Sequence, residues 1–560
     1  MSTDTDWWRD AVVYQVYPRS FADSDGDGLG DLPGVTSRLD YLRQLGVDAV
    51  WLSPFFLSPQ ADAGYDVADY RAVDPVFGTL ADVDTLIAEA GARGLRVLLD
   101  LVPNHSSDEH PWFQAALAAP PGAPQRELYH FADGRGPEGA RPPNNWRSVF
   151  GGPAWTRVTE TDGAPGQWYL HLFDTRQPDW NWEHPAVQAE FEAVLRFWLD
   201  RGVAGFRIDV AHGLVKAPGL PDTTVAQTLL GLDVVADGAT PEATPTHAMP
   251  YWDQDGVHAV YRRWRRLLDS YGPPARILCA EAWVTPPDRM ARYLRSDEIH
   301  QGFAFDVLQA PWDARALRAA ITTELDTLRR VGASATWVLS NHDVVRHATR
   351  LGLPRTGGLP HGIRATDPQP NRQLGRARAR AATTVLLALP GAAYLYQGEE
   401  LGLPEHTTLP DGFRKDPVHL RTGGAEVGRD GCRVPLPWRA EAPAYGFSPS
   451  GRSWLPQPRE FREYAADLQV GVSGSTHELY RQLLALRRAH RLGRGELVWE
   501  SKAKTKDLLV LRNGPVRVIV NFGAVPIAVN PDWEVLVASG PLEPVDGSLP
   551  PDTAVWVRAD

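Results

Sequence analysis

The chain has 560 residues, of which 43% are hydrophobic and 22% are charged, and its formal net charge is −12 at pH 7. These values are typical of a globular protein with more than one domain, and the acidic balance argues against a nucleic-acid partner, which would need a basic face. Two cysteines are too few for a disulfide framework, and the sequence has neither a membrane-length apolar run nor a signal peptide pattern. We therefore expect a cytoplasmic protein with no membrane partner, and the oligomeric state stays open.

Short apolar segments of strand length recur along the first 400 or so residues, with helical periodicity between several of them, for example over 35–46 and 83–94. Strands that alternate with helices predict an α/β fold, namely a parallel (β/α)8 TIM barrel. The predicted strands are 11–17, 49–55, 96–102, 205–210, 276–283, 302–307, 335–341 and 392–398.

Irregular stretches interrupt this alternation. Residues 106–172, after the third predicted strand, are rich in Pro, Gly and Trp and predict an inserted subdomain, and the irregular segment 403–460 should lie over the top face of the barrel. After a predicted helix at 478–490 the pattern changes to strands with short polar links, which predicts a C-terminal all-β domain. Its predicted strands are 507–513, 516–522, 525–531, 533–539 and 553–559. The predicted domains are 1–105 and 173–490 for the barrel, 106–172 for the inserted subdomain and 491–560 for the β domain.

Acidic, imidazole and guanidinium side chains gather at the predicted C-terminal ends of these strands, where a barrel of this type places its catalytic residues. A single carboxylate there usually caps a turn or forms a salt bridge. Several together carry a cost in repulsion and desolvation that indicates a function. The set is Asp100 and His105 after the third strand, Arg207 and Asp209 after the fourth, Glu281 after the fifth, and His342 and Asp343 after the seventh.

Three converging carboxylates suit the hydrolysis of a glycosidic bond, in which one attacks the anomeric carbon and another protonates the leaving oxygen. A third can stabilise the positive charge of the transition state. Arg207 precedes Asp209 by two residues, so both face the same side of a strand and the cation can keep Asp209 ionised. Glu281 lies beside Trp283 and Cys279, and a less polar setting raises a carboxyl pKa as a general acid requires.

A second motif, DSDGDGLGD at 23–31, follows the first predicted strand. Alternating aspartates with a glycine at the turn are typical of a calcium loop, although position 12 is Gly34 and not the glutamate of an EF-hand. The alternative is an Asp/Gly-rich turn without a metal. The expected ligands are Asp23, Asp25, Asp27, the Leu29 carbonyl and Asp31, and the ion would be structural because the loop carries none of the catalytic carboxylates.

Several segments occur in the order known from one family. They include DLVPNHSS (100–107), GFRIDVAHG (205–213), LCAEAW (278–283) and SNHDVVR (340–346). On these motifs the chain resembles glycoside hydrolase family 13, the α-amylase superfamily, and particularly its α-glucosidase and oligo-1,6-glucosidase branch. The resemblance covers nearly the whole chain, and it implies a Ca²⁺ ion in the 23–31 loop.

The resemblance also implies residue roles. Asp209 would be the nucleophile, Glu281 the general acid/base and Asp343 the transition-state stabiliser. Arg207, His105 and His342 would contact the first glucose or orient these carboxylates. Tyr65 would form a stacking platform under that glucose, and Asp66 would pair with Arg433 to hold its far hydroxyls.

The expected activity is that of an exo-acting retaining α-glucosidase, which releases glucose from the non-reducing ends of short α-glucosides. The residues after the nucleophile leave the linkage open: Val210 resembles the α-1,6-preferring branch, whereas 211–222 resemble maltose-hydrolysing enzymes, and α-1,4 bonds are favoured. The alternatives are an oligo-1,6-glucosidase and a glucosyl-transferring or isomerising enzyme like trehalose synthase or amylosucrase. A non-catalytic transporter subunit is not expected, because the chain keeps its carboxylates.

Overall fold

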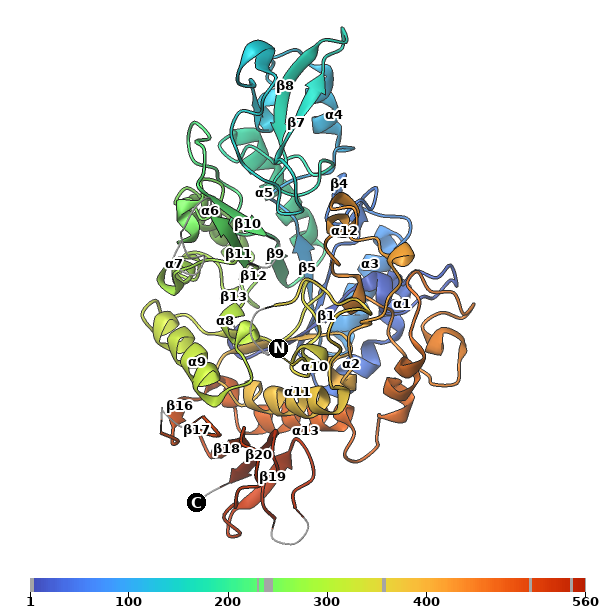
Figure 1. The fold of residues 1–560 in the computed structure, drawn as a ribbon, viewed down its shortest axis with the longest axis vertical. Helices are drawn as coiled ribbons and strands as arrows, with labels where there is room; N and C mark the ends of the chain where they lie inside the picture. The colour runs from blue at the N-terminus through green and yellow to red at the C-terminus, as the bar shows by residue number, and fades with distance from the viewer. Residues whose placement is uncertain are drawn as a thin grey trace.

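The computed structural model describes residues 5–228, 231–235, 245–354, 359–502, 506–543 and 547–558. A barrel lies at the centre, a small lobe that contains α4, β7 and β8 extends from one end, and a C-terminal sheet lies at the opposite end (Figure 1). In the part of the chain that the structure describes, no helix is long and apolar enough to cross a membrane.

The predicted (β/α)8 barrel is confirmed. Its eight parallel strands are hydrogen-bonded in the order β13-β12-β9-β5-β2-β1-β15-β14, and a parallel bridge between Phe303 and Thr336 joins the two ends. β9 and β15 therefore face each other across the barrel, as do β1 and β12. The strands are β1 Val12–Val16, β2 Ala49–Leu52, β5 Arg96–Leu101, β9 Gly205–Ile208, β12 Ile277–Ala280, β13 Gln301–Gly302, β14 Thr336–Val338 and β15 Ala392–Tyr396.

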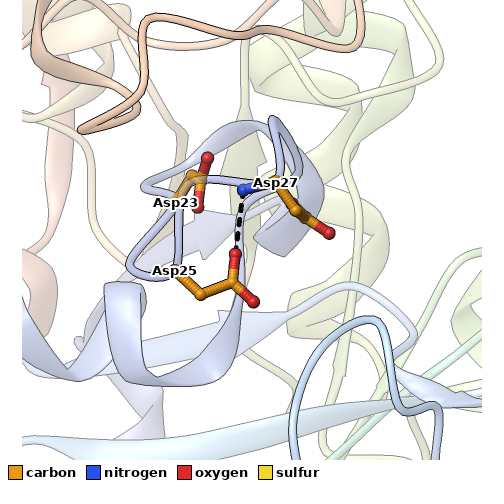
Figure 2. A group of neighbouring side chains, drawn as sticks. All are labelled: Asp23, Asp25 and Asp27. Carbon is orange, nitrogen blue, oxygen red and sulfur yellow. Dashed lines mark hydrogen bonds between the residues drawn. The ribbon is translucent and has the colours of Figure 1, made fainter.

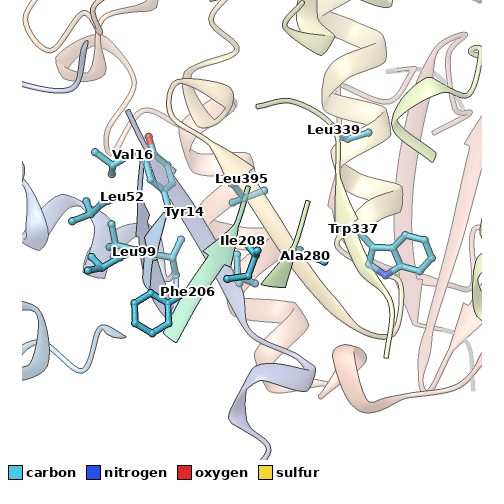
Figure 3. Close-up of a cluster of buried hydrophobic side chains, with 14 of the residues drawn as sticks. Tyr14, Val16, Leu52, Leu99, Phe206, Ile208, Ala280, Trp337, Leu339 and Leu395 are labelled. Atoms are coloured by element: carbon cyan, nitrogen blue, oxygen red, sulfur yellow. The ribbon is translucent and has the colours of Figure 1, made fainter. Parts of the chain in front are cut away.

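Side chains alternate along these strands and so form two separate cores. One set faces the surrounding helices, and Figure 3 shows part of it, including Tyr14, Leu52 and Leu99. The neighbouring residues, such as Val13 and Trp51, fill the barrel interior. This apolar filling occupies much of the barrel below its upper rim.

Local interactions determine where several helices begin and end. α3 begins at a capping box formed by Thr79 and Asp82, and the predicted helix at 35–46 is divided into α1 and α2 at Arg38, whose backbone leaves the helical region (φ −109°, ψ 6°). The helices are α1 Leu32–Ser37, α2 Leu39–Leu45, α3 Leu80–Ala92, α4 Pro111–Ala118, α5 Pro185–Asp200, α6 Val257–Asp269, α7 Pro287–Tyr293, α8 Phe305–Gln309, α9 Ala314–Arg329, α10 His347–Arg350, α11 Arg372–Leu386, α12 Pro417–Arg421 and α13 Thr476–Ala489.

Smaller antiparallel sheets complete the fold. Three strands, in the order β6-β8-β7, lie in the inserted lobe, and five, in the order β16-β17-β18-β20-β19, form the C-terminal domain. The remaining strands are β3 Phe56–Leu57, β4 Asp69–Val73, β6 Phe131–Ala132, β7 Trp155–Thr159, β8 Pro165–Leu170, β10 Val225–Thr228, β11 Gly231–Val235, β16 Leu497–Trp499, β17 Leu508–Asn513, β18 Val516–Asn521, β19 Glu534–Ala538 and β20 Thr553–Arg558.

Two predicted strands were wrong in part. The sixth barrel strand ends at Gly302, and the rest of the predicted segment 302–307 turns into α8. The segment 525–531 forms only an isolated bridge, from Ile527 to Leu549, because Pro526 and Pro531 cannot donate to a ladder.

Candidate active site

Arg207 lies at the centre of a buried carboxylate cluster. The strand register pairs it with Asp100 on one side and Cys279 on the other. Its Nη1 atom lies 2.8 Å from Asp100 Oδ1 and 2.5 Å from Asp209 Oδ1, and its Nη2 atom lies 3.7 Å from Glu281 Oε2. One cation therefore contacts three carboxylates, and both Asp209 and Glu281 lie close to the same planar group.

Arg207 lies closer to Asp209 than to Glu281, so it affects the pKa values of these two carboxylates differently. Burial raises the pKa of Glu281, and Arg207 only partly opposes the rise. Burial also raises the pKa of Asp209, but Arg207 lies much nearer to that group. The arrangement favours an ionised Asp209 and a protonated Glu281, which are the states that a nucleophile and a general acid need.

The backbone after Asp209 orients Glu281. Val210 has φ +45°, an unusual conformation for a β-branched residue, and its N–H group donates a 2.9 Å hydrogen bond to Glu281 Oε2. The main chain therefore holds one oxygen of Glu281, and the strained turn at Val210 links the two carboxylates.

Asp343 lies among positive or hydrogen-bonding groups. Its carboxylate is 3.0 Å from Arg429, 3.2 Å from Arg433 and 3.3 Å from His342 Nε2. Burial alone would raise the pKa of Asp343, but His342, Arg429 and Arg433 together hold it below its ordinary value. Asp343 is thus held ionised in a partly buried setting.

Tyr65 and His105 form a neighbouring part of the site. The Tyr65 ring stacks on His342 with a centroid distance of 5.2 Å and an interplanar angle of 6°, and its hydroxyl donates to Asp100 at 2.9 Å. His105 Nε2 lies 3.1 Å from the Tyr65 carbonyl oxygen. Burial lowers the pKa of His105 to about 3, so the ring is neutral.

The predicted pairing of Asp66 with Arg433 was wrong. Asp66 is fully buried and accepts hydrogen bonds from the backbone N–H groups of Ala61 and Asp62, so its carboxylate stabilises a turn. Asp62 instead pairs with Arg429, whose Nη2 atom lies 2.9 Å from Asp62 Oδ1. Arg433 donates to the His342 carbonyl and to Asp343, from behind the pocket wall.

These groups surround one pocket of about 680 Å³, counted with its open mouth. Six of the predicted site residues line it: Tyr65, His105, Asp209, Glu281, His342 and Asp343. Other lining residues were not predicted, namely Asp62, Arg429, Phe150, Phe173 and Trp252, and Trp283 was predicted only as part of the apolar setting of Glu281. The signal for aromatic walls was the high tryptophan content of the chain, with 20 tryptophans in 560 residues, which does not separate pocket residues from core residues.

The loop after β1 brings three of the predicted metal ligands together. Carboxylate oxygens of Asp23, Asp25 and Asp27 lie within 4.8 Å of one another (Figure 2). Asp31 is not part of this cluster, and its two oxygens accept from Ser24 and from the Gly34 N–H at the start of α1. The two oxygens of Asp23 also accept hydrogen bonds, from the N–H groups of Gly26 and Gly28. The Leu29 N–H donates to Asp27 Oδ1. The three convergent hard oxygen donors suit Ca²⁺, whereas Asp31 acts as a helix cap.

Comparisons with known proteins identify the family of the chain. Residues 15–495 match the α-amylase catalytic domain family. A probable α-glucosidase of Rhizobium meliloti is 39% identical over 513 residues, which cover 89% of this chain and 85% of the relative, and maltase A2 of Drosophila melanogaster is 35% identical over 544 residues, which cover 93% and 87%.

Two solved structures extend the comparison to transferring enzymes. The α-glucosyl transfer enzyme XgtA has a TM-score of 0.83 at 36% identity, with 99% of both chains covered. A variant of the trehalulose synthase MutB has a TM-score of 0.83 at 30% identity, with 99% of this chain and 100% of the other covered. The chain belongs to glycoside hydrolase family 13, the α-amylase family. It is an α-glucosidase-like glycosidase whose relatives include both hydrolases and transferring enzymes.

Proposed function

We propose that this enzyme is an exo-acting retaining α-glucosidase that removes single glucose units from short α-1,4-linked substrates. The Asp62–Arg429 ion pair carries the proposal. These residues follow β2 and β15, the two strands that flank β1 in the barrel, so the pair closes the pocket on the β1 side. Glu281, the group that would protonate the leaving oxygen, follows β12 on the opposite side. A closed end and an opposite leaving-group side suit a terminal glucose unit.

The proposed reaction has two displacements at the anomeric carbon. Asp209 attacks this carbon while Glu281 gives its proton to the glycosidic oxygen, so the carbon–oxygen bond to the leaving sugar breaks and a covalent glucosyl ester forms on Asp209. Glu281, now ionised, takes a proton from water as the water oxygen attacks the same carbon. The ester bond breaks, α-glucose leaves, and both carboxyl groups return to their initial states.

The surrounding residues would stabilise the glucosyl unit in this reaction. Asp343 would oppose the positive charge that develops on the ring, and Asp62 with Arg429 would bind its far hydroxyls. Tyr65 would support the apolar face of the ring. The short contacts from Arg207 to both Asp209 and Glu281 favour the close carboxylate spacing of retaining enzymes.

Transfer of glucose to a second sugar is the alternative outcome of the second displacement. It is favoured by the likeness to XgtA and MutB, whose names describe glucosyl transfer and trehalulose synthesis. The chemistry differs only in the acceptor, because a sugar hydroxyl replaces water as the group that Glu281 deprotonates.

Product analysis on maltose, isomaltose, trehalose, sucrose and a long maltodextrin tests the proposal. We expect the highest initial rate on maltose, glucose as the first product from maltodextrin, and the α-anomer of glucose by NMR. Internal fragments at early times would contradict exo-action, initial β-glucose would contradict retention, and longer oligosaccharides or isomerised disaccharides without free glucose would favour the transferring alternative.

We also propose that Asp23, Asp25 and Asp27 bind a structural Ca²⁺ ion. Their oxygens converge in a loop that contacts the segment 448–453, since Gly26 O accepts from Ser450 and Arg452. The ion would tie this loop to the segment 448–453.

A further inference from the structure

His342 is held on all sides by specific groups. Its ring stacks on Tyr65, with a centroid distance of 5.2 Å and an interplanar angle of 6°, and on Tyr17, with 5.8 Å and 20°. At its edges, Nδ1 lies 2.7 Å from Gln15 Nε2, and Nε2 lies 3.3 Å from Asp343 Oδ2. Both ring nitrogens therefore have a fixed partner.

The charges around His342 decide which nitrogen carries the proton. Burial lowers its pKa well below the ordinary value, and the nearby Arg433, Arg207 and Arg429 lower it further, against the opposing effect of Asp343. The ring is therefore neutral and carries one N–H group. Because Asp343 is ionised and only accepts, that N–H must be at Nε2. Nδ1 is then an acceptor, and the Gln15 amide must donate to it.

The Gln15 amide is itself held by the barrel. Its Nε2 atom also donates to Ser53 Oγ at 3.1 Å, and Ser53 follows β2, the strand that pairs with β1. The Ser53 N–H donates to the Val16 carbonyl at 2.9 Å, which fixes the serine beside Gln15. Two neighbouring strands thus set the position of the amide, whose Oε1 atom has no hydrogen-bond partner among the described residues. The direction of the amide follows from His342, whose unprotonated Nδ1 needs a donor.

A second histidine of the pocket has the same arrangement. Asn104 Nδ2 lies 3.1 Å from His105 Nδ1. This amide cannot be reversed, because its Oδ1 atom accepts from Lys216 at 3.0 Å while its Nδ2 atom donates to Asp179 at 3.0 Å. His105 Nδ1 is then an acceptor too. An amide N–H directed at Nδ1 is a shared feature of both histidines.

We propose that Gln15 is a positioning residue that holds His342 as the neutral Nε2–H tautomer, with its ring N–H directed toward Asp343 and the glucose-binding side of the pocket. Gln15 acts through His342, since it is buried and is not among the described residues that line the pocket. The inference rests on the proposed function for its kinetic consequence, but the tautomer itself is a property of the free protein.

The substitution Gln15→Glu reverses the hydrogen bond without changing the shape of the side chain. An ionised glutamate would accept a hydrogen bond from an Nδ1–H group and raise the pKa of His342, while Arg207, Arg429 and Arg433 would oppose the rise. At a pH below this pKa, both nitrogens of the His342 ring carry a proton, so the Nε2–H group is present. At a pH above this pKa, the ring loses its Nε2 proton, because the hydrogen bond to the glutamate keeps the other proton on Nδ1. We therefore expect kcat/KM on maltose to fall about tenfold or more as pH rises, through an additional ionisation that the wild-type enzyme lacks.

Gln301→Glu is the matched control. Gln301 is a buried glutamine on barrel strand β13 that bonds to Trp8 and Tyr394, away from the pocket histidines. It introduces the same buried carboxylate, so a loss caused by destabilisation alone would appear in both variants. Only Gln15→Glu should change the shape of the pH profile.

Nitrogen NMR of the wild-type protein with ¹⁵N-labelled histidine gives the second readout, with His342 assigned by the signal that disappears in His342→Asn. We expect Nδ1 to resonate as an unprotonated ring nitrogen and Nε2 as a protonated one. A protonated Nδ1, or a Gln15→Glu profile identical to that of Gln301→Glu, would overturn the inference. A wild-type enzyme without activity on any α-glucoside would instead refute the proposed function, and the NMR result would still decide the tautomer.

Discussion

Asp62 and Arg429 are 367 residues apart in the sequence, yet their side chains form an ion pair of 2.9 Å at the wall of the pocket. The same guanidinium reaches Asp343 at 3.0 Å, so a single arginine joins the closed end of the pocket to the carboxylate that would face the reacting ring. Burial raises the pKa of Asp62 to about 7, and Arg429 opposes a further rise. The pKa values of Asp62 and Asp343 therefore both depend on Arg429.

The first prediction follows from this pair. Asp62→Ala should raise KM and lower kcat on maltose, with kcat/KM reduced about 100-fold, because the terminal glucose loses a positioning contact and Arg429 loses a partner. Steady-state kinetics on maltose measures this. Asp66→Asn is the control, since that carboxylate stabilises a turn and should affect the melting temperature more than KM. Wild-type kinetics in a folded Asp62→Ala variant would remove Asp62 from the glucose site.

The second prediction concerns the nucleophile. Asp209→Asn should lower kcat about 10⁴-fold or more while the fold persists, because an amide cannot form the glucosyl ester. Circular dichroism and the melting temperature would show that the variant is folded. Turnover close to that of the wild type would exclude Asp209 as the attacking group.

The third prediction concerns the proton donor. Glu281→Gln should reduce the glycosylation rate on maltose much more than on an activated aryl α-glucoside, whose leaving oxygen needs little protonation. The expected difference between the two substrates is about 10²-fold or more, and pre-steady-state kinetics resolves the glycosylation step. Equal losses on both substrates would assign the acid role to another residue.

The fourth prediction is the pH dependence of the wild-type enzyme. Asp209 and Glu281 titrate as a pair, and the active form carries one proton, on Glu281. Activity should fall at low pH as Asp209 takes up a proton and at high pH as Glu281 loses its own, which gives a bell-shaped profile of kcat/KM. Because burial raises both pKa values, the alkaline limb should lie above the ordinary carboxyl range. Glu281→Gln should abolish the alkaline limb, and its persistence there would assign it to another group.

The fifth prediction concerns the metal loop. Chelation should lower the melting temperature by roughly 2–4 °C, because a ligand that binds only the folded state stabilises it. Asp23→Ala should mimic chelation and make the protein insensitive to the chelator. An unchanged melting temperature in both experiments would mean that the aspartates form only a hydrogen-bonded turn.

The sequence was sufficient for the barrel and for six of the residues that line the pocket. Strand periodicity and a polar residue at each strand end follow from local rules, and these rules placed Asp209, Glu281 and Asp343 correctly around one cavity. Arg207 also shares a face with Asp209, as the two-residue spacing on a strand requires.

These local rules did not predict which loop side chains enter the pocket. Asp62 and Asp66 lie in one short segment. Only the folded turn shows that Asp66 accepts hydrogen bonds from backbone N–H groups, whereas Asp62 lines the pocket. Arg429 and Arg433 lie four residues apart in an irregular segment with no periodicity to set their directions. The role of a carboxylate or an arginine on a loop depends on partners that are distant in the sequence, and a local sequence pattern does not identify these partners.

The attachment of the C-terminal sheet has a consequence for how this enzyme can change. Trp556 Nε1 donates to the Thr384 carbonyl, and Asn513 Nδ2 donates to the Ala388 carbonyl. The C-terminal sheet is therefore hydrogen-bonded to the chain at the end of α11, just before β15. Arg429 lies beyond the other end of β15. One unit of the barrel is thus attached to the C-terminal sheet at its base and carries Arg429 at its rim. Substitutions in the rim loop should leave the attachment at the base intact, whereas substitutions of Trp556 or Asn513 should destabilise the unit that carries Arg429.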